Sequence, residues 1–189
     1  MPEIIRTLID RRERPKPSVL PEELRIAYGG DLWFPPSGSQ RLVVSGSGRT
    51  DLTRAIFRTA GIRTLIVTTQ GGSDLLAASG VGSLISTEVR TLEGPIVAPA
   101  SILELLRTEF GVSLLLHEGG PTLFGSFVAN GCVDELFLTI APQVAGRNRQ
   151  PPRPGLIAGV EFLPEAAPWL DIVSVKERGN RLYLRYSAV

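Results

Sequence analysis

Short apolar runs alternate with segments of helical spacing from Arg41 onward. The runs that predict strands are Arg41–Ser45, Thr64–Thr68, Ser113–His117 and Glu135–Ala141, with shorter candidates at Leu84–Ser86 and Ile96–Val97. The segments that predict helices follow Asp51, cover Ser73–Ser79 before Gly80, run from Ser101 to Gly111, and cover Pro121–Asn130 before Gly131. Strands that alternate with helices are typical of βα units, which build parallel sheets.

Residues with special roles at helix ends set the expected helix boundaries. Asp51 is a candidate cap for a helix that closes at Gly61. Ser101 and Glu104 form a capping box, and Gly111 is the expected end of that helix. Each predicted helix therefore begins soon after a predicted strand, as a βα unit requires.

The C-terminal part has a different pattern. Leu170–Lys176 and Arg181–Tyr186 alternate between apolar and polar residues, and Gly179 and Asn180 lie between them. This arrangement favours a hairpin, which follows a Pro-rich loop over 150–155. The predicted fold class is α/β with three layers, a mainly parallel sheet and antiparallel C-terminal strands.

Residues 1–40 do not follow the βα pattern. Ile4, Ile5, Leu8 and Ile9 have helical spacing, but a charged stretch with two prolines follows, and Gly and Pro residues recur over 29–38. We expect residues 1–40 to form an N-terminal arm or extension, and residues 41–189 to form the folded domain.

Composition narrows the function classes. The chain has 189 residues, 43% of them apolar, which is enough for one globular domain. A net charge of +1 disfavours nucleic acid, and a single His and a single Cys disfavour a zinc or other metal site. The sequence has neither an apolar run of ~18 residues nor a signal-peptide core, so we expect a cytoplasmic protein without membrane contact.

The segment His117 to Leu123 is the strongest candidate for chemistry. It falls where a predicted strand runs into a predicted helix, and a helix N-terminus provides unpaired N–H groups to an anion such as a phosphate. Gly119 and Gly120 leave room for a ligand, and Glu118 is placed to bind sugar hydroxyls or face a developing cation. The alternative is that the two glycines only form a tight turn and Glu118 caps the helix. For His117, a packing role is favoured over a role as a catalytic base.

A second candidate lies after the first predicted strand. Ser45-Gly46-Ser47-Gly48-Arg49 contains a G-x-G, but Asp51 stands where a dinucleotide fingerprint has its third glycine. The hydroxyls and Arg49 either contact a nucleotide or belong to a plain loop, and the same two alternatives apply to Thr68 and Thr69. Cys132 has no basic neighbour in sequence, which favours an inert thiol.

These residues resemble a known family. The segment 115–123, with Val133-Asp134-Glu135-Leu136, Thr139–Pro142 and Gly146, looks like the reductase domain of the riboflavin-biosynthesis deaminase/reductase, which has a dihydrofolate-reductase-like fold. Arg41–Asp51, Phe57 and Leu65–Thr69 are similar to the family's middle section, so the resemblance covers about residues 41–186.

The resemblance implies an NADPH-dependent oxidoreductase of the pyrimidine reductase type. Its substrate would be a 5-amino-6-(5-phosphoribosylamino)uracil-type compound, reduced to the ribitylamino form in riboflavin biosynthesis. By resemblance Glu118 would bind the substrate, and the cofactor would contact Gly119, Gly120, Pro121, Thr122, Leu123 and Phe124, together with Ser45, Gly46, Ser47 and Thr68. No catalytic residue is assigned, and none of this chemistry needs a metal or a thiolate.

One departure from the family leaves alternatives open. The family's Ser-Leu-Asp-Gly-type strand end and its Val-Gly-x-Gly-Thr segment are not found in residues 1–40. The first alternative is a catalytically impaired or noncatalytic nucleotide-binding or assembly paralogue of the same fold. A more remote one is a Rossmann-type dehydrogenase that uses Gly46 and Gly48. An uncovered central sheet edge would favour a homodimer or strand exchange.

Overall fold

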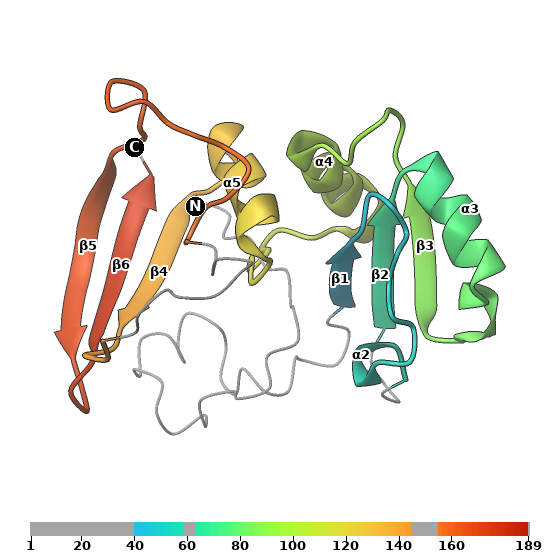
Figure 1. Ribbon diagram of the computed structural model, residues 1–189, viewed down its shortest axis with the longest axis horizontal. Helices are drawn as coiled ribbons and strands as arrows, with labels where there is room; N and C mark the ends of the chain where they lie inside the picture. The colour runs from blue at the N-terminus through green and yellow to red at the C-terminus, as the bar shows by residue number, and fades with distance from the viewer. Residues whose placement is uncertain (1–39, 59–62, 145–154, 189) are drawn as a thin grey trace. The chain divides into compact units, whose positions relative to one another are not determined.

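The computed structural model describes residues 40–58, 63–144 and 155–188 (Figure 1). These residues divide into two units, one that ends at Val97 and one that begins at Ala98, and each is described by itself. The predicted N-terminal arm, the helix end at Gly61, Gly146 and most of the Pro-rich loop lie outside the described residues.

The first unit is built on a parallel sheet of three strands. β1 (Gln40–Val44), β2 (Arg63–Thr68) and β3 (Thr87–Thr91) lie in the order β1-β2-β3. The central strand β2 is buried from Thr64 to Thr68, which explains why its sequence is a continuous apolar and β-branched run rather than an alternating one.

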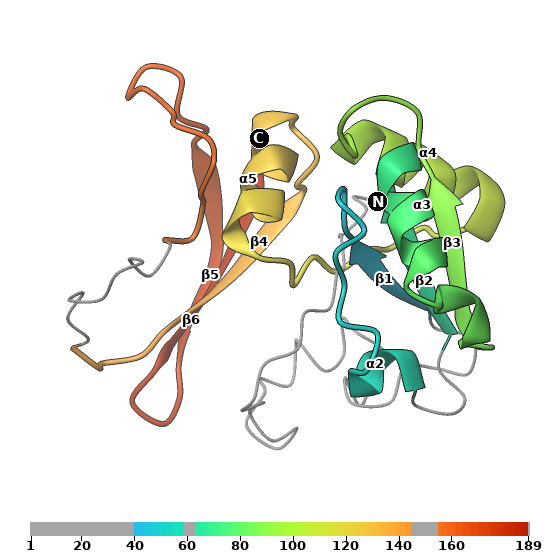
Figure 2. The ribbon, with the colours of Figure 1, turned by 45° about the vertical axis from the view of Figure 1, so that its right-hand side comes forward.

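Three short helices belong to the described part of this unit, and one of them packs beside β3. The unit contains α2 (Ala55–Arg58), α3 (Gln70–Ala78) and the short 3₁₀ helix η2 (Val81–Ser83), and α3 runs alongside β3 in Figures 1 and 2. One cluster of the unit's core contains a buried side chain from each of these helices and one from β2, namely Phe57, Leu76, Val81 and Ile66.

The second unit combines two helices with an antiparallel sheet. α4 (Pro99–Phe110) and α5 (Pro121–Ala129) precede β4 (Glu135–Ile140), β5 (Leu170–Glu177) and β6 (Leu182–Ala188), which lie in the order β4-β6-β5. A β-bulge interrupts β5 between Ile172 and Ser174.

The C-terminal hairpin has the turn that its sequence predicts. The two central residues Gly179 and Asn180 have φ of 58° and 60°, and Arg178 and Arg181 exchange both backbone hydrogen bonds. Two successive positive φ angles define a type I′ turn, whose twist matches that of the strands it joins. The fold class is therefore confirmed: an α/β fold with parallel strands followed by antiparallel C-terminal strands.

The predicted strand Ser113–His117 is wrong. The segment has no ladder to another described strand, and only Glu118 forms a single bridge. Leu115 is buried but Ser113 and Leu114 are exposed, so the apolar run is not the centre of a sheet among the described residues. A run of leucines signals burial, whereas a strand also needs a neighbour to accept its backbone hydrogen bonds.

Two short predicted strands are also wrong. Leu84–Ser86 and Ile96–Val97 have no strand structure, and the third parallel strand is β3 at 87–91. The sequence of β3 alternates Thr, Glu, Val, Arg and Thr, and four of its five residues are only half-buried. An edge strand of this kind lacks the apolar run used to find the others.

Several helix ends differ from the predicted ones. α3 begins at Gln70 after the N-cap Thr69, and not at the predicted Ser73. α4 begins at Pro99 after the N-cap Ala98, so Ser101 and Glu104 do not open it. Asp51 does not cap α2, because its carboxylate accepts hydrogen bonds from the backbone N–H and hydroxyl of Thr53 at 3.1 and 2.6 Å. Local side-chain bonds of this kind compete with helix capping.

No helix in the described part of the chain is long and apolar enough to cross a membrane. Within the same residues, His, Cys, Asp and Glu side chains form no group of three or more that could hold a metal ion.

Candidate functional site

The loop after β1 is fastened to the start of α3. The Thr68 hydroxyl donates to the carbonyl oxygen of Ser45 at 2.6 Å, and the Thr69 hydroxyl donates to that of Gly46 at 2.8 Å. Thr69 also caps α3, since its hydroxyl oxygen accepts from the Gly72 N–H at 3.2 Å. The two threonines therefore join the carboxyl ends of β1 and β2 and the helix start into one arrangement.

Two glycines allow this close approach. Gly48 has φ of +67°, and a Cβ there would lie 2.1 Å from the Gly72 carbonyl oxygen. A Cβ on Gly72 would lie 1.9 Å from the Thr68 Oγ1 and 2.7 Å from the Gly46 oxygen. Gly48 is thus required by the protein's own packing, which weakens the interpretation of Gly46 and Gly48 as a dinucleotide fingerprint.

Some polar groups at the loop after β1 are exposed to a ligand, and others are buried and hydrogen-bonded within the protein. Gly46, Ser47 and Arg49 are exposed, whereas Thr68 is fully buried and its hydroxyl proton is used by Ser45. Gln70 and Gly71, in the first turn of α3, have N–H groups without an intrahelical acceptor. Exposed loop groups beside a helix N-terminus suit an anionic or hydroxyl-rich ligand.

The second candidate group lies at the start of α5. Gly120 is the N-cap of this helix and makes no side-chain hydrogen bond as a cap, and the first intrahelical bond runs from the Phe124 N–H to the Gly120 carbonyl at 3.0 Å. The N–H groups of Thr122 and Leu123 therefore have no acceptor within the helix. Together with the helix dipole they form a site that favours negative charge.

Glu118 lies two residues before this helix start and is exposed. Because Gly120 is the N-cap, the alternative reading of Glu118 as the helix cap is wrong. A carboxylate beside an anion-favouring helix start gives the segment both signs of charge, so it suits a ligand with an anionic part and a cationic or hydroxyl-bearing part.

His117, the residue before Glu118 in the sequence, packs against α5. Its ring centroid lies 5.4 Å from that of Phe124 and 5.0 Å from that of Phe127, and its Nδ1 accepts a hydrogen bond from the Gly119 N–H at 3.2 Å. Burial lowers the pKa of His117 below its ordinary value of 6.5. The imidazole is therefore neutral at pH 7, with its proton on Nε2, as expected for a packing role.

A segment beyond the predicted site covers the first turns of α5. The Ala158 N–H donates to the Pro121 carbonyl at 3.1 Å, and a Cβ on Gly125 would lie 2.8 Å from the Ala158 oxygen. Gly159, with φ of +78°, lies against Thr122. Sequence reasoning missed this contact, although a glycine inside a helix, as at Gly125, often marks a close approach of another segment.

The two candidate groups lie on different units. Ser45, Gly46, Ser47 and Thr68 belong to the first unit, and residues 118–124 belong to the second. Within each unit the structure brings the predicted residues together, around the start of α3 in one and the start of α5 in the other.

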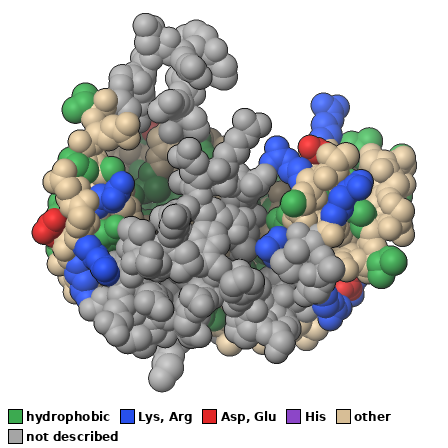
Figure 3. Space-filling model, turned by 90° about the horizontal axis from the view of Figure 1, so that it is seen from below, with side chains coloured by type: hydrophobic (Ala, Val, Ile, Leu, Met, Phe, Trp, Pro, Cys, Tyr) green, Lys and Arg blue, Asp and Glu red, His purple; other side chains and the backbone are tan. Residues whose placement is uncertain are grey.

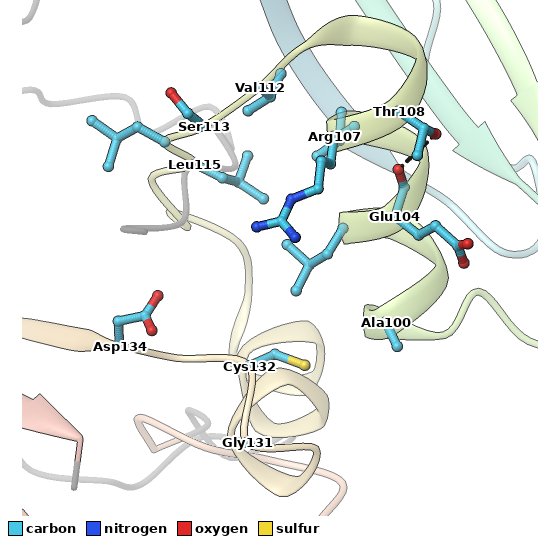
Figure 4. A pocket seen from close by; sticks show the side chains of 13 residues that line it. Ala100, Glu104, Arg107, Thr108, Val112, Ser113, Leu115, Gly131, Cys132 and Asp134 are labelled. Atoms are coloured by element: carbon cyan, nitrogen blue, oxygen red, sulfur yellow. Dashed lines mark hydrogen bonds between the residues drawn. The ribbon is translucent and has the colours of Figure 1, made fainter. Parts of the chain in front are cut away.

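The second unit also has a cavity, and none of the site residues described above lines it. It measures about 730 Å³ and lies between α4, the segment 112–115 and the turn from α5 to β4 (Figure 4). Cys132 lines it, and burial together with the Asp134 carboxylate raises the pKa of that thiol. A raised pKa disfavours the thiolate, so Cys132 is unsuited to be a nucleophile, as expected.

Charge on the visible surface is mixed. Figure 3 shows Lys and Arg side chains at several separate places, with Asp and Glu side chains near some of them. The formal net charge of +1 agrees with this mixture.

The fold and the motif at α5 define a class of protein. The α/β arrangement matches structures of reductases with the dihydrofolate-reductase-like fold. A sequence profile of the RibD C-terminal domain matches residues 11–184, and the chain belongs to this family. The family match begins well before Arg41, where the resemblance of the motifs begins.

Relatives agree with this assignment. The riboflavin biosynthesis protein RibD of Bacillus amyloliquefaciens is 34% identical over 117 residues, which are 61% of this chain and 30% of that protein. A pyrimidine reductase-like protein from Corynebacterium diphtheriae has a TM-score of 0.60 at 19% identity, covering 92% of this chain and 69% of that one. RibD of Acinetobacter baumannii has a TM-score of 0.58 at 17% identity, covering 79% and 38%.

The chain therefore spans only about a third of the length of these RibD proteins. At identities below 20%, the solved structures show the fold alone.

Proposed function

We propose that this chain is an NADPH-dependent reductase that converts a 5-amino-6-(5-phosphoribosylamino)uracil-type substrate to its ribitylamino form. The observation that carries the proposal is the Glu118-Gly119-Gly120-Pro121 turn at the start of α5, in a chain of the RibD C-terminal domain family. The segment combines the Glu118 carboxylate with the N–H groups of Thr122 and Leu123, which have no acceptor within the helix. A site for a phosphorylated, charge-developing substrate and an anionic cofactor requires both kinds of group.

The residues present fit NADPH. The N–H groups of Thr122 and Leu123 suit its diphosphate, because no side chain caps the helix in the described structure and Gly120 has no side chain to block an approach. The adenosine half is assigned to the exposed Gly46 and Ser47 by the family resemblance alone, and Thr68 holds their loop in place. When bound, NADPH supplies the hydride.

Glu118 has the electrostatic role in this proposal. Reduction at the anomeric carbon of an opened ribose passes through an iminium-like carbon, and a nearby carboxylate stabilises its positive charge. The attraction is strong where water is excluded. Glu118 would also accept hydrogen bonds from ribosyl hydroxyls, which orients the carbon that receives the hydride.

The first test measures NADPH oxidation by absorbance with the deaminated phosphoribosylamino-uracil. Glu118→Gln should lower kcat by about 100-fold, the scale of losing one electrostatic stabiliser, and leave NADPH affinity unchanged. Glu93→Gln, at an exposed carboxylate before α4, is the matched control and should behave as wild type. Equal activity of Glu118→Gln and wild type would remove Glu118 from the mechanism.

A noncatalytic nucleotide-binding or assembly role is the second candidate. It is favoured by the segment 113–117, which has no ladder to another strand among the described residues although it leads directly into the site. This candidate predicts saturable NADPH binding without turnover of any phosphoribosylamino-pyrimidine. Measurable turnover would exclude it.

We also propose that the chain forms a homodimer through the sheet of β4, β5 and β6. The strand register places Ile140, Leu182 and Leu184, Ile172 and Val175 on one face, and Ile172 and Val175 are 66% and 55% exposed. An exposed apolar face of this kind marks an interaction surface. Val175→Lys should yield a monomer in sedimentation, whereas Asp171→Lys, on the opposite face of the same strand, should leave the dimer intact.

A further inference from the structure

The imidazole of His117 contacts both the Glu118-Gly119 turn and helix α5. His117 ends the irregular segment 113–117 and precedes Glu118, and its ring lies against Phe124 and Phe127 of α5. Its Nδ1 accepts the hydrogen bond of the Gly119 N–H, two residues further along the chain. One side chain thus binds the turn by a hydrogen bond and the helix by its ring.

The turn is shaped to this ring. A Cβ on Gly119 would lie 2.6 Å from Cε1 and 3.0 Å from Nε2 of His117 and 3.2 Å from a methyl of Leu123. A side chain at 119 would therefore crowd the imidazole, so the ring favours glycine at this position. The ring, the Gly119 backbone and the first turns of α5 form one packed unit, and Glu118 lies between two of its members.

The hydrogen bond depends on a neutral imidazole. Only a deprotonated Nδ1 has the lone pair that accepts the Gly119 N–H, so the proton resides on Nε2, which is buried without a partner among the described residues. The side chains packed against the ring, Phe124 and Phe127, carry no charge. Glu118, on the adjacent residue, is the titratable group next to it in the chain.

We propose that His117 is a positioning residue: its Nδ1 fixes the Glu118-Gly119 turn and thereby sets the Glu118 carboxylate and the N–H groups at the start of α5 in their binding positions. This inference rests on the proposed function where ligand binding is concerned, while its structural part concerns the turn alone. A purely structural histidine would contribute to stability but not to ligand binding.

Two variants of the full chain separate the hydrogen bond from the packing. His117→Asn places its Oδ1 where Nδ1 lies, so it keeps the acceptor and loses the ring. His117→Phe keeps a ring against Phe124 and Phe127 and loses the acceptor. Each variant is examined by circular dichroism first, and the Asn variant keeps the test decisive even if the Phe variant is destabilised.

The readouts are hydrogen exchange of the Gly119 amide, measured by NMR, and NADPH affinity. Loss of one hydrogen bond, worth ~1 kcal/mol, should raise both the exchange rate and the NADPH Kd of His117→Phe about fivefold. His117→Asn should retain wild-type values in both. In His117→Phe the KM for NADPH should rise with the Kd, and kcat should fall as well, because the Glu118 carboxylate that stabilises the developing positive charge is no longer fixed.

Two outcomes would overturn the inference: wild-type exchange at Gly119 in His117→Phe, or an equal loss in His117→Asn and His117→Phe. If the wild-type chain does not bind NADPH, the proposed function fails, and the exchange of Gly119 in the two variants still decides whether His117 fixes the turn.

Discussion

Two adjacent glycines in the first turn of α3 should respond to the same substitution with opposite signs. Gly71→Ala adds a methyl group that meets no atom within 4 Å. Gly72→Ala adds one that would lie 1.9 Å from the Thr68 Oγ1, 2.7 Å from the Gly46 carbonyl oxygen and 2.9 Å from the Gly48 nitrogen. The pair therefore tests how closely the loop after β1 packs on α3.

The magnitudes follow from two terms. Replacing a helical glycine by alanine stabilises by up to ~1 kcal/mol because the unfolded chain loses freedom. Overpacking against a rigid neighbour costs about 1–3 kcal/mol. Two of the three atoms that a Cβ on Gly72 would meet are backbone atoms, so they cannot rotate away. Gly71→Ala should thus gain roughly 0.5–1 kcal/mol and Gly72→Ala should lose about 1–2 kcal/mol.

Urea unfolding followed by circular dichroism measures the free energy of unfolding of both variants. The dependence of that free energy on urea concentration should be the same in the two variants. NADPH affinity should also fall in Gly72→Ala and not in Gly71→Ala, because only the former displaces Gly46 and Ser47. If Gly72→Ala is as stable as Gly71→Ala, the interlocked arrangement of Thr68, Gly46 and Gly48 is wrong.

Three further predictions concern stability. The Glu135 carboxylate is only 6% exposed and pairs with Arg185 of β6. Glu135→Ala should lower the free energy of unfolding in urea by about 2 kcal/mol. Glu88→Ala, at a more exposed ion pair, should lower it by less than ~1 kcal/mol. Burial lowers the pKa of His117, so the imidazole binds a proton more readily in the unfolded chain than in the folded one. The free energy of unfolding should therefore fall as pH drops below 6.5. Melting temperatures measured over a pH series should show this dependence in the wild type and a weaker one in His117→Asn. Asn180→Gly should leave the hairpin unchanged, while Asn180→Val should destabilise it by ~1 kcal/mol or more because φ is 60° there; equal melting temperatures would contradict this.

The parts of the fold that follow local rules could be predicted from the sequence. The β2 run, the helix Pro121–Ala129 and the turn at Gly179 and Asn180 are specified by residues within each segment, namely β-branched side chains, an early proline and two residues that tolerate positive φ. The family resemblance rests on such a local segment, 115–123, and is confirmed.

The parts that depend on distant neighbours could not be predicted. Ser113–His117 has the apolar run of a strand, but whether it forms one depends on a partner strand elsewhere in the chain. The same holds for the site: the pattern picked out Gly119 and Gly120, whereas the contact between Gly125 and Ala158, and that between Gly48 and Gly72, join segments far apart in sequence. A glycine inside a helix indicates that some segment approaches closely, but the spacing of residues does not identify which segment it is.

The most direct test of the central claim is transfer of deuterium from NADPH labelled at the reactive position of its nicotinamide. With the full chain and the deaminated phosphoribosylamino-uracil, the account predicts loss of NADPH absorbance and a product that contains one deuterium in its ribityl chain. Undiminished NADPH and an unlabelled substrate, in a preparation that is folded by circular dichroism, would contradict it.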